Sequence, residues 1–315
     1  MKLKELLNDW LQKYIKHSIK LRTFLLYQGI IKNHIVPILG EYKLHDLSPK
    51  IIQNFISSKI EDGNLSNKQK LSYNTVYSIT SVLKQVLNYA FSLSLLPKDL
   101  LTTIKLPPVS EKKIEIFETF EQQKIENYCL FSKPNYIGIV LCLYTGIRIG
   151  ELLALTWEDI DLENKIISIN KSLSILKIKG SSSKHIDKPK TKSSIRIIPI
   201  PKQLIPFIKK IKKTSQSKYL ISTRNNEMVD IRSYQRSFEA MQKRLNIKYR
   251  NFHSLRHTFA TRALELGMDV KTLSEILGHN NATVTLNRYT HSLLEYKKEM
   301  INKLGKNIDN KCFKN

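Results

Sequence analysis

The sequence predicts a mainly α-helical protein of two domains, the second of which also holds a small antiparallel β-sheet. Apolar residues recur at three- and four-residue steps over much of the chain, which is the spacing of one helix face. Between residues 165 and 200 the pattern changes to an alternation of β-branched and polar residues, which is typical of strands. The 315 residues suffice for two ordinary domains.

Four helices are predicted before residue 100, and short loops between them favour a small bundle. Ser48 followed by Pro49 is a typical helix start, because serine caps the first turn and proline fits the first helical position. The predicted helices run from Leu3 to about Tyr14, from about Leu21 to Pro37 and Gly40, from Ser48 to Gly63, and from about Tyr73 to Leu95.

The segment from Lys105 to Lys113 combines prolines with clustered charge and has little to bury, so it is predicted to be a linker. We therefore expect a helical domain at residues 1–104, a linker at 105–115 and a second domain at 116–315.

The second domain is expected to start with helices between Thr119 and Glu151. The nearly all-apolar run from Ile137 to Tyr144 predicts a buried helix that ends at Thr145–Gly146, just before Arg148. Strands are predicted at 165–170, 172–178 and 194–200, a loop at 180–187, and helices at 201–213, 233–245, 253–266, 270–277 and about 289–303.

The charge balance predicts a polyanionic partner. Lysine and arginine total 52 against 27 aspartate and glutamate, a net charge of +25. Such a protein attracts nucleic acid through counterion release. An acidic membrane surface is the alternative on charge alone. No apolar run approaches a membrane span and the N-terminus lacks a signal core, so we expect a cytoplasmic protein without membrane contact.

No metal or cofactor site is predicted. Cys129, Cys142 and Cys312 lack zinc-site spacing, and the first two lie in apolar stretches that predict core thiols. Neither an HExxH motif nor a phosphate-binding loop ending in Gly-Lys-Ser/Thr is present.

Six residues in chain order have the chemistry to cut a phosphodiester without a metal. Guanidinium groups bind planar oxygen pairs bidentately, so two arginines can replace a metal clamp. A tyrosine can attack phosphorus if a neighbour takes its proton. The candidates are Arg148, Lys190, His253, Arg256, His279 and Tyr289.

The segments around these candidates resemble the tyrosine recombinase family, also called the phage integrase family. The matching segments, in order, are Thr145-Gly-Ile-Arg-Ile-Gly-Glu151, Pro189-Lys-Thr191, His253-Ser-Leu-Arg256, Leu277-Gly-His279 and Asn287-Arg-Tyr-Thr-His291. One such triplet arises easily by chance, whereas five in order are specific. The first hundred residues also resemble the family's helical core-binding domain, more loosely.

The resemblance implies a role for each candidate. Arg148 and Arg256 would clamp the scissile phosphate, and His279 would hydrogen-bond it. Lys190 would protonate the departing 5′ oxygen, and His253 would take the proton of Tyr289. The products would be a 3′-phosphotyrosyl enzyme and a free 5′ hydroxyl, with no cofactor.

Four of the candidates also have a simpler structural explanation. Arg148 could pair only with Glu151, three residues on, although the resemblance lets Glu151 support the site. His279 could cap a helix that ends at Gly278. His253 and Arg256 share a helix face but could be a cap and a surface group. Lys190 is preferred over its neighbours Lys184, Lys188 and Lys192 because it precedes Thr191, as in the family.

The resemblance implies a site-specific DNA recombinase of a mobile element, acting in integration, excision, inversion or resolution. It would work as a homotetramer on two double-stranded DNA sites, with the segment after Tyr289 reaching into a neighbouring subunit and with accessory DNA-bending or directionality proteins as possible partners. The core-binding helices begin almost at Met1, which fits a simple two-site enzyme or a shortened relative. The alternatives are a type IB topoisomerase and a catalytically inactive DNA-binding regulator.

Overall fold

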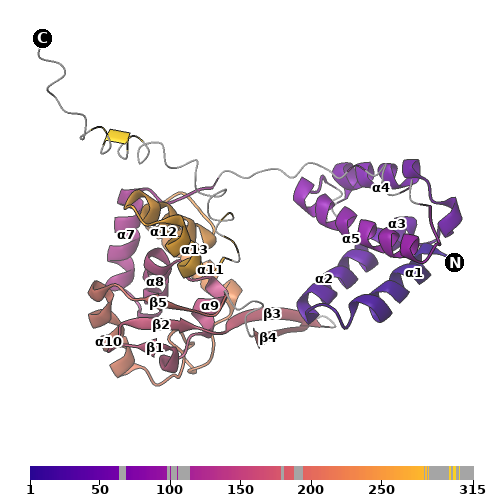
Figure 1. The fold of residues 1–315 in the computed structure, drawn as a ribbon. Helices are drawn as coiled ribbons and strands as arrows, with labels where there is room; N and C mark the ends of the chain where they lie inside the picture. The colour runs from indigo at the N-terminus through magenta and orange to yellow at the C-terminus, as the bar shows by residue number, and fades with distance from the viewer. Residues whose placement is uncertain are drawn as a thin grey trace, which may run out of the picture. The chain divides into compact units, whose positions relative to one another are not determined.

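The fold is seen in a computed structural model of the chain (Figure 1). It divides into two compact units, residues 1–113 together with 177–181 and residues 114–176 together with 182–315. The structure describes residues 1–63, 69–97, 100, 105, 114–178, 181–187, 194–279, 281, 283, 298, 301, 302 and 305.

In its described residues up to Ser92, the first unit has four continuous helical segments, as the sequence predicted. Their bounds are α1 (Leu3–Asp9) with η1 (Trp10–Ile15), α2 (Leu21–Ile30) with η2 (Ile31–Ile35) and α3 (Val36–Leu39), then α4 (Pro49–Asp62) and α5 (Tyr73–Ser92), with a short turn η3 (Leu44–Asp46) before α4. Large side chains such as Trp10, Ile35 and Ile52 are buried in a shared core. Each segment therefore contributes an apolar face to the bundle.

Caps set where two of these helices begin. The Ser48 side chain accepts a hydrogen bond from the Ile51 backbone N–H and Pro49 follows at the first helical position, as expected. Ser72 caps α5 in the same way, by accepting from the Thr75 backbone N–H at 3.2 Å. In each case the side chain satisfies a backbone donor that the first turn leaves without a partner.

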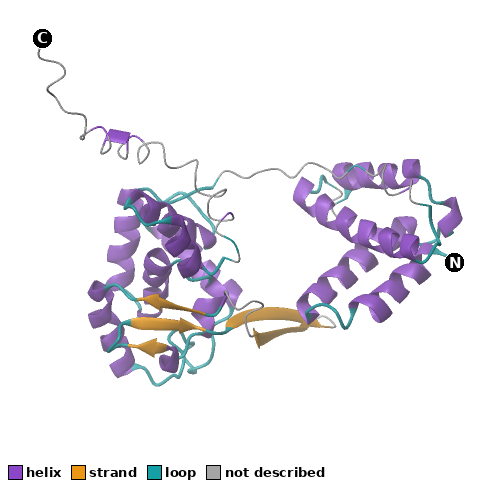
Figure 2. Ribbon diagram, viewed as in Figure 1, coloured by secondary structure: helices purple, strands orange, loops and turns teal. Residues whose placement is uncertain are grey.

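The second unit contains most of the remaining helices (Figure 2). Their bounds are α7 (Thr119–Leu130), η4 (Pro134–Tyr136), α8 (Ile137–Thr145), α9 (Ile149–Ala154), η5 (Trp157–Asp159), η7 (Lys202–Leu204), α10 (Ile205–Thr214), α11 (Ile231–Arg244), α12 (His253–Glu265) and α13 (Val270–Leu277). All residues of α8 except Tyr144 are buried, so this helix forms the centre of the unit's core. The buried helix predicted for 137–144 is confirmed.

Both sheets are small. Strands β1 (Ile160–Asp161), β2 (Ile166–Ile169) and β5 (Arg196–Pro199) form an antiparallel sheet in the order β1-β2-β5, in which Ile167 pairs with Ile198. Strands β3 (Ser172–Ile178) and β4 (Ser181–Asp187) form a separate hairpin. In Figure 1, α8, α12 and α13 gather on one side of the three-stranded sheet.

One sequence prediction in this region is wrong. Residues 180–187 were expected to form a loop, whereas Ser181–Asp187 is strand β4. Six of its seven residues are exposed, so the strand carries no apolar alternation that a sequence pattern would reveal. Backbone pairing with β3 holds the strand in place, and the local amino-acid composition of 181–187 does not predict this pairing.

Several predictions fall outside the described residues: the linker at 106–113, Lys190, Cys312 and nearly all of the helix at 289–303. Cys129 and Cys142 are free and buried, as expected, and burial raises the pKa of the Cys129 thiol to about 12. In the described part of the chain, no helix has both the length and the apolar character needed to cross a membrane.

Candidate active site

The site is built where α8 ends. Gly146 closes the helix in the left-handed conformation, with φ of +63°. A Cβ at this position would lie 2.6 Å from side-chain atoms of both Leu277 and Phe259. Glycine is therefore required twice, for the backbone conformation and for the close approach of α12 and α13. The tight turn places Arg148 directly at the start of α9.

Arg148 is held at the N-terminus of α9 by Glu151. The Arg148 backbone N–H donates to Glu151 Oε2 at 3.0 Å, and Arg148 Nη1 donates to Glu151 Oε1 at 2.8 Å. Arg148 Nη2 donates to the Gly278 carbonyl at 3.2 Å. The side chain nevertheless remains 35% exposed. The predicted pair with Glu151 thus coexists with a guanidinium that solvent, or a ligand, can reach.

Arg256 joins the ends of two helices from inside the unit. It is only 2% exposed. Its Nη1 donates to the Gly146 carbonyl at 2.7 Å and its Nη2 to the Leu277 carbonyl at 2.8 Å. The C-termini of α8 and α13 are thereby held beside one guanidinium, and the negative end of each helix dipole favours a cation there.

His279 follows the left-handed Gly278 that ends α13. Arg256 Nη2 lies 2.8 Å from His279 Nε2. Because a guanidinium has donors but no acceptor, Nε2 must be the acceptor and the ring proton must lie on Nδ1. Arg256 and His279 thus contact each other at the end of α13.

His253 is the first residue of α12, one turn before Arg256. It is exposed, and its ring packs edge-on against His257, with ring centroids 4.7 Å apart. The two site residues of this helix thus sit at different depths, His253 at the surface and Arg256 in the interior.

Arg196 was missed in the sequence and belongs to the same cluster. It lies on β5 and donates from Nη2 to Glu151 Oε2 at 2.8 Å and from Nη1 to Glu151 Oε1 at 3.2 Å. A signal for it exists, because the alternation of β5 puts Arg196 and Ile198 inward while Ile195 and Ile197 are more than half exposed. An arginine at an inward position of a strand requires a buried partner.

The charges around Glu151 fix its ionisation. Burial alone would raise the pKa of the Glu151 carboxyl, but hydrogen bonds and charge from Arg196, followed by the charge of Arg148, hold it below the usual value. The cluster then holds three guanidinium groups, of Arg148, Arg196 and Arg256, against one carboxylate. This excess of positive charge suits the site to an anion such as a phosphate.

Four of the seven residues predicted for the site form two contacting pairs, Arg148 with Glu151 and Arg256 with His279. The end of α13 links the two pairs, because Arg148 donates to the Gly278 carbonyl and Arg256 to the Leu277 carbonyl. His253 lies on the helix that carries Arg256. Lys190 and Tyr289 lie outside the described residues. In the part of the chain that the structure describes, no group of three or more histidine, cysteine, aspartate or glutamate side chains could hold a metal ion.

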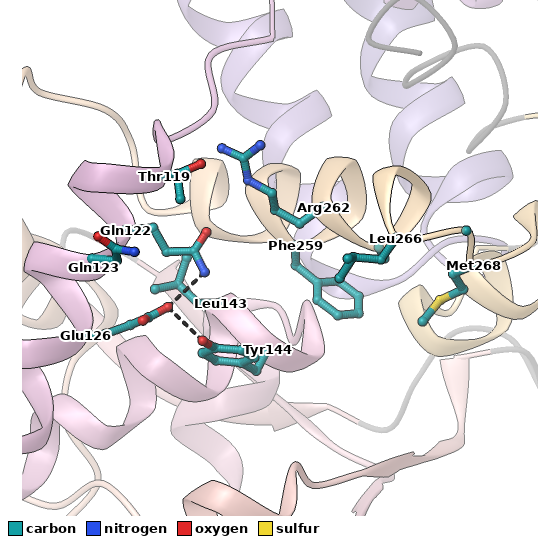
Figure 3. Close-up of a pocket in the computed structure, with 12 residues that line it drawn as sticks. Thr119, Gln122, Gln123, Glu126, Leu143, Tyr144, Phe259, Arg262, Leu266 and Met268 are labelled. Atoms are coloured by element: carbon teal, nitrogen blue, oxygen red, sulfur yellow. Dashed lines mark hydrogen bonds between the residues drawn. The ribbon is translucent and has the colours of Figure 1, made fainter. Parts of the chain in front are cut away.

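A separate cavity of about 690 Å³ lies between α7, α8 and α12 (Figure 3). Phe259, Leu266 and Met268 line one side of it. On the other side, the Tyr144 hydroxyl donates to Glu126 Oε1 at 2.9 Å. Its lining residues include no residue predicted for the site. The cavity and the arginine cluster are therefore distinct features of the second unit.

An arginine cluster beside a histidine, set on helix termini, can bind a phosphate and stabilise negative charge that develops on its oxygens. Residues 110–295 match the model of the phage integrase family, and residues 2–60 match the model of the phage integrase N-terminal SAM-like domain. The chain belongs to the phage integrase family. It is a tyrosine-type site-specific recombinase, as the sequence predicted.

Curated relatives agree with this assignment, and a solved structure has a similar fold. The chain is 32% identical to a tyrosine recombinase XerC-like protein of Caldanaerobacter subterraneus subsp. tengcongensis, over 96% of this chain and 82% of the relative. It is 30% identical to the integrase of Staphylococcus phage L54a, over 96% and 92%. The fold is similar to that of the Tn1549 transposon integrase in complex with a circular intermediate DNA, with a TM-score of 0.80, 23% identity, and coverage of 96% of this chain and 99% of that one.

Proposed function

We propose that this recombinase exchanges strands between two double-stranded DNA sites through a covalent 3′-phosphotyrosyl intermediate on Tyr289. The observation that carries the proposal is the half-exposed Arg148, anchored by Glu151 and placed beside Arg256 and His279. This cluster offers a fixed set of donors and positive charge to one phosphate.

In the cleavage step, the Tyr289 phenol oxygen bonds to phosphorus while the bond between phosphorus and the 5′ oxygen breaks. His253 accepts the phenol proton, and Lys190 gives a proton to the departing 5′ oxygen. The phosphodiester is replaced by a phosphotyrosyl ester, so the bond energy is retained. A 5′ hydroxyl from the second site then attacks the ester and releases Tyr289.

The arginines contribute from two sides. Arg148 meets the non-bridging oxygens directly because its side chain reaches the surface. Arg256 approaches from the interior, where low polarity strengthens its attraction for the developing charge. His279 hydrogen-bonds the phosphate beside Arg256. Because protein hydrogen bonds hold these groups in place, the transition state requires little reorganisation.

The assembly belongs to the same proposal. Residues 1–104 form a helical domain that binds the core DNA site, 105–115 link it to the catalytic domain at 116–315, and four copies act on two sites. This tetramer is supported by a solved structure with a similar fold, in which a lambda integrase tetramer is bound to a Holliday junction. The net charge of +25 supplies the attraction for DNA. Accessory DNA-bending or directionality proteins would set which products form.

The test is covalent capture. The protein is mixed with sheared DNA from its own source and denatured, and the attached fragments are sequenced from their ends. Tyr289→Phe should yield no adduct while binding DNA as the wild type does. Tyr249→Phe is the matched control, since Tyr249 is 60% exposed and outside the arginine cluster, and it should leave the adduct unchanged.

The outcomes separate the candidate activities. Ends clustered at one or a few sequences support site-specific recombination, whereas scattered ends would identify a topoisomerase-like activity. Adducts that persist in Tyr289→Phe would overturn the choice of nucleophile. If the wild type gives no adduct, the result favours a DNA-binding regulator or a missing accessory factor.

A further inference from the structure

Three consecutive carbonyl groups at the end of α13 each accept a hydrogen bond from a different arginine. Arg196 Nε donates to the Ile276 carbonyl, Arg256 Nη2 to that of Leu277 and Arg148 Nη2 to that of Gly278. The two preceding carbonyls are used inside the helix end, because the N–H groups of His279 and Gly278 bond to Ser274 and Glu275. Arg196 is therefore part of the same construction as the two arginines that the proposed function uses.

Arg196 differs from Arg148 in what it can reach. Its side chain is 6% exposed, against 35% for Arg148. Its donors point to both oxygens of Glu151, to Ile276 and to the Ser194 carbonyl. Because its Nε, Nη1 and Nη2 atoms all donate to protein groups, the Arg196 guanidinium is fully engaged within the protein.

Glu151 transmits the position of Arg196 to Arg148. Glu151 Oε1 accepts from Arg148 Nη1 at 2.8 Å and from Arg196 Nη1 at 3.2 Å. Glu151 Oε2 accepts from the Arg148 backbone N–H and from Arg196 Nη2. Both carboxylate oxygens are thus shared, and two donors of Arg196 fix the orientation of the carboxylate plane. Without Arg196, Glu151 could follow Arg148 instead of restraining it.

We propose that Arg196 is a positioning residue for strand cleavage, which acts through Glu151 to hold the Arg148 guanidinium where the scissile phosphate binds. The inference rests on the proposed function, in which Arg148 contacts that phosphate. A misplacement of about 1 Å can cost roughly 10²-fold in rate, so a buried group without substrate contact can affect cleavage strongly.

A purely structural role must be distinguished from positioning, because Arg196 also joins β5 to the end of α13. The charge of the substrate provides the distinction. In a methylphosphonate linkage, a methyl group replaces one non-bridging oxygen and removes the negative charge that Arg148 would neutralise. Loss of Arg148, or loss of its correct position, should then matter less than on a normal phosphodiester.

The experiment measures single-turnover formation of the covalent adduct on the captured DNA site, with a phosphodiester or a methylphosphonate at the scissile position. The quantity compared is the ratio of the phosphodiester rate to the methylphosphonate rate. Arg148→Met should lower this ratio, which validates the readout. Arg196→Met should lower it by about tenfold or more. The double variant should have the same ratio as Arg148→Met, because Arg196 acts through Arg148.

Arg250→Met is the matched control. Arg250 is another arginine of the second unit in a buried ion pair, with Nη1 3.0 Å from Glu121 Oε1 and side chains 10% and 8% exposed. It belongs to none of the contacts around Glu151. Its substitution should lower both rates together, if at all, and leave the ratio unchanged. Should Arg196→Met fail to fold, Arg196→Lys replaces it, since lysine keeps the charge but cannot make the two-point contact.

The outcomes keep the two ideas apart. A wild type without a Tyr289-dependent adduct, or an unchanged ratio in Arg148→Met, would count against the proposed function. If those two behave as expected but Arg196→Met keeps the wild-type ratio, as Arg250→Met does, then Arg196 only stabilises the fold and the inference is wrong. The inference is supported if Arg196→Met lowers the ratio and Arg250→Met does not.

Discussion

Replacing Gly146 with alanine should destabilise the second unit far more than the same replacement at an exposed glycine does. Gly146 has φ of +63°, where an L-residue is strained, and its added Cβ would lie 2.6 Å from atoms of Leu277 and Phe259. Leu277 is completely buried, so it cannot move aside into solvent. Two independent costs therefore add at one position.

The magnitude follows from these two costs. A left-handed conformation costs an L-residue about 1–2 kcal/mol. Overpacking a close-packed core costs a further ~1–3 kcal/mol. The free energy of unfolding should thus fall by roughly 2–5 kcal/mol in Gly146→Ala. Gly267 is the matched control, because its φ is +89° but nothing lies within 4 Å of an added Cβ. Gly267→Ala should show only the conformational cost, about 1–2 kcal/mol.

The assay is urea unfolding of the full chain, followed by a signal from the second unit. A urea dependence of about 2 kcal/mol per molar converts the expected difference between the two variants into a midpoint shift of roughly 0.5–1.5 M. Coincident midpoints for Gly146→Ala and Gly267→Ala would refute the reasoning, because they would mean that the contact with Leu277 and Phe259 carries no free energy.

Two further predictions concern the arginine cluster. Glu151→Gln should lower the free energy of unfolding at pH 7. The folded-state pKa of Glu151 lies below its usual value of 4.5, so the stabilisation by the ionised carboxylate is fully present above pH 4.5 and is lost as the pH falls through the folded-state pKa. Urea midpoints of wild type and variant should therefore converge on acidification, and a constant gap would contradict the ionic explanation. Arg256→Ala should slow adduct formation at saturating DNA by roughly 10²- to 10³-fold. A loss smaller than about tenfold would indicate that Arg256 serves mainly the fold.

The sequence was informative wherever one local pattern decides the outcome. Ser48–Pro49 predicts a helix start because both residues act within one turn. The apolar run of α8 and the glycine behind it predict a buried helix that ends at Thr145–Gly146, and α8 ends there. Arg148, Glu151, Arg256 and His279 could be grouped only by their family resemblance, since residues from three helix ends meet through the tertiary fold.

The sequence was uninformative wherever partners are distant and the pattern is weak. Strand β4 depends on pairing with β3, and its serine-rich residues give no signal of their own. Arg196 contacts Glu151, 45 positions earlier, and Ile276, 80 positions later. Its strand was predicted, but an arginine at one inward position of a strand does not reveal which buried carboxylate or carbonyl it will meet.

Backbone carbonyls at the ends of two helices hold the arginine side chains of the cluster in place. Helices α8 and α13 both end in a left-handed glycine, Gly146 and Gly278, so the chain turns away and leaves terminal carbonyls open to other donors. Guanidinium groups satisfy these carbonyls and are attracted by the negative ends of the helix dipoles. The positive charges are thus gathered by backbone groups that carry no full negative charge of their own. An anion that arrives at Arg148 therefore meets an excess of positive charge that only the single carboxylate of Glu151 offsets.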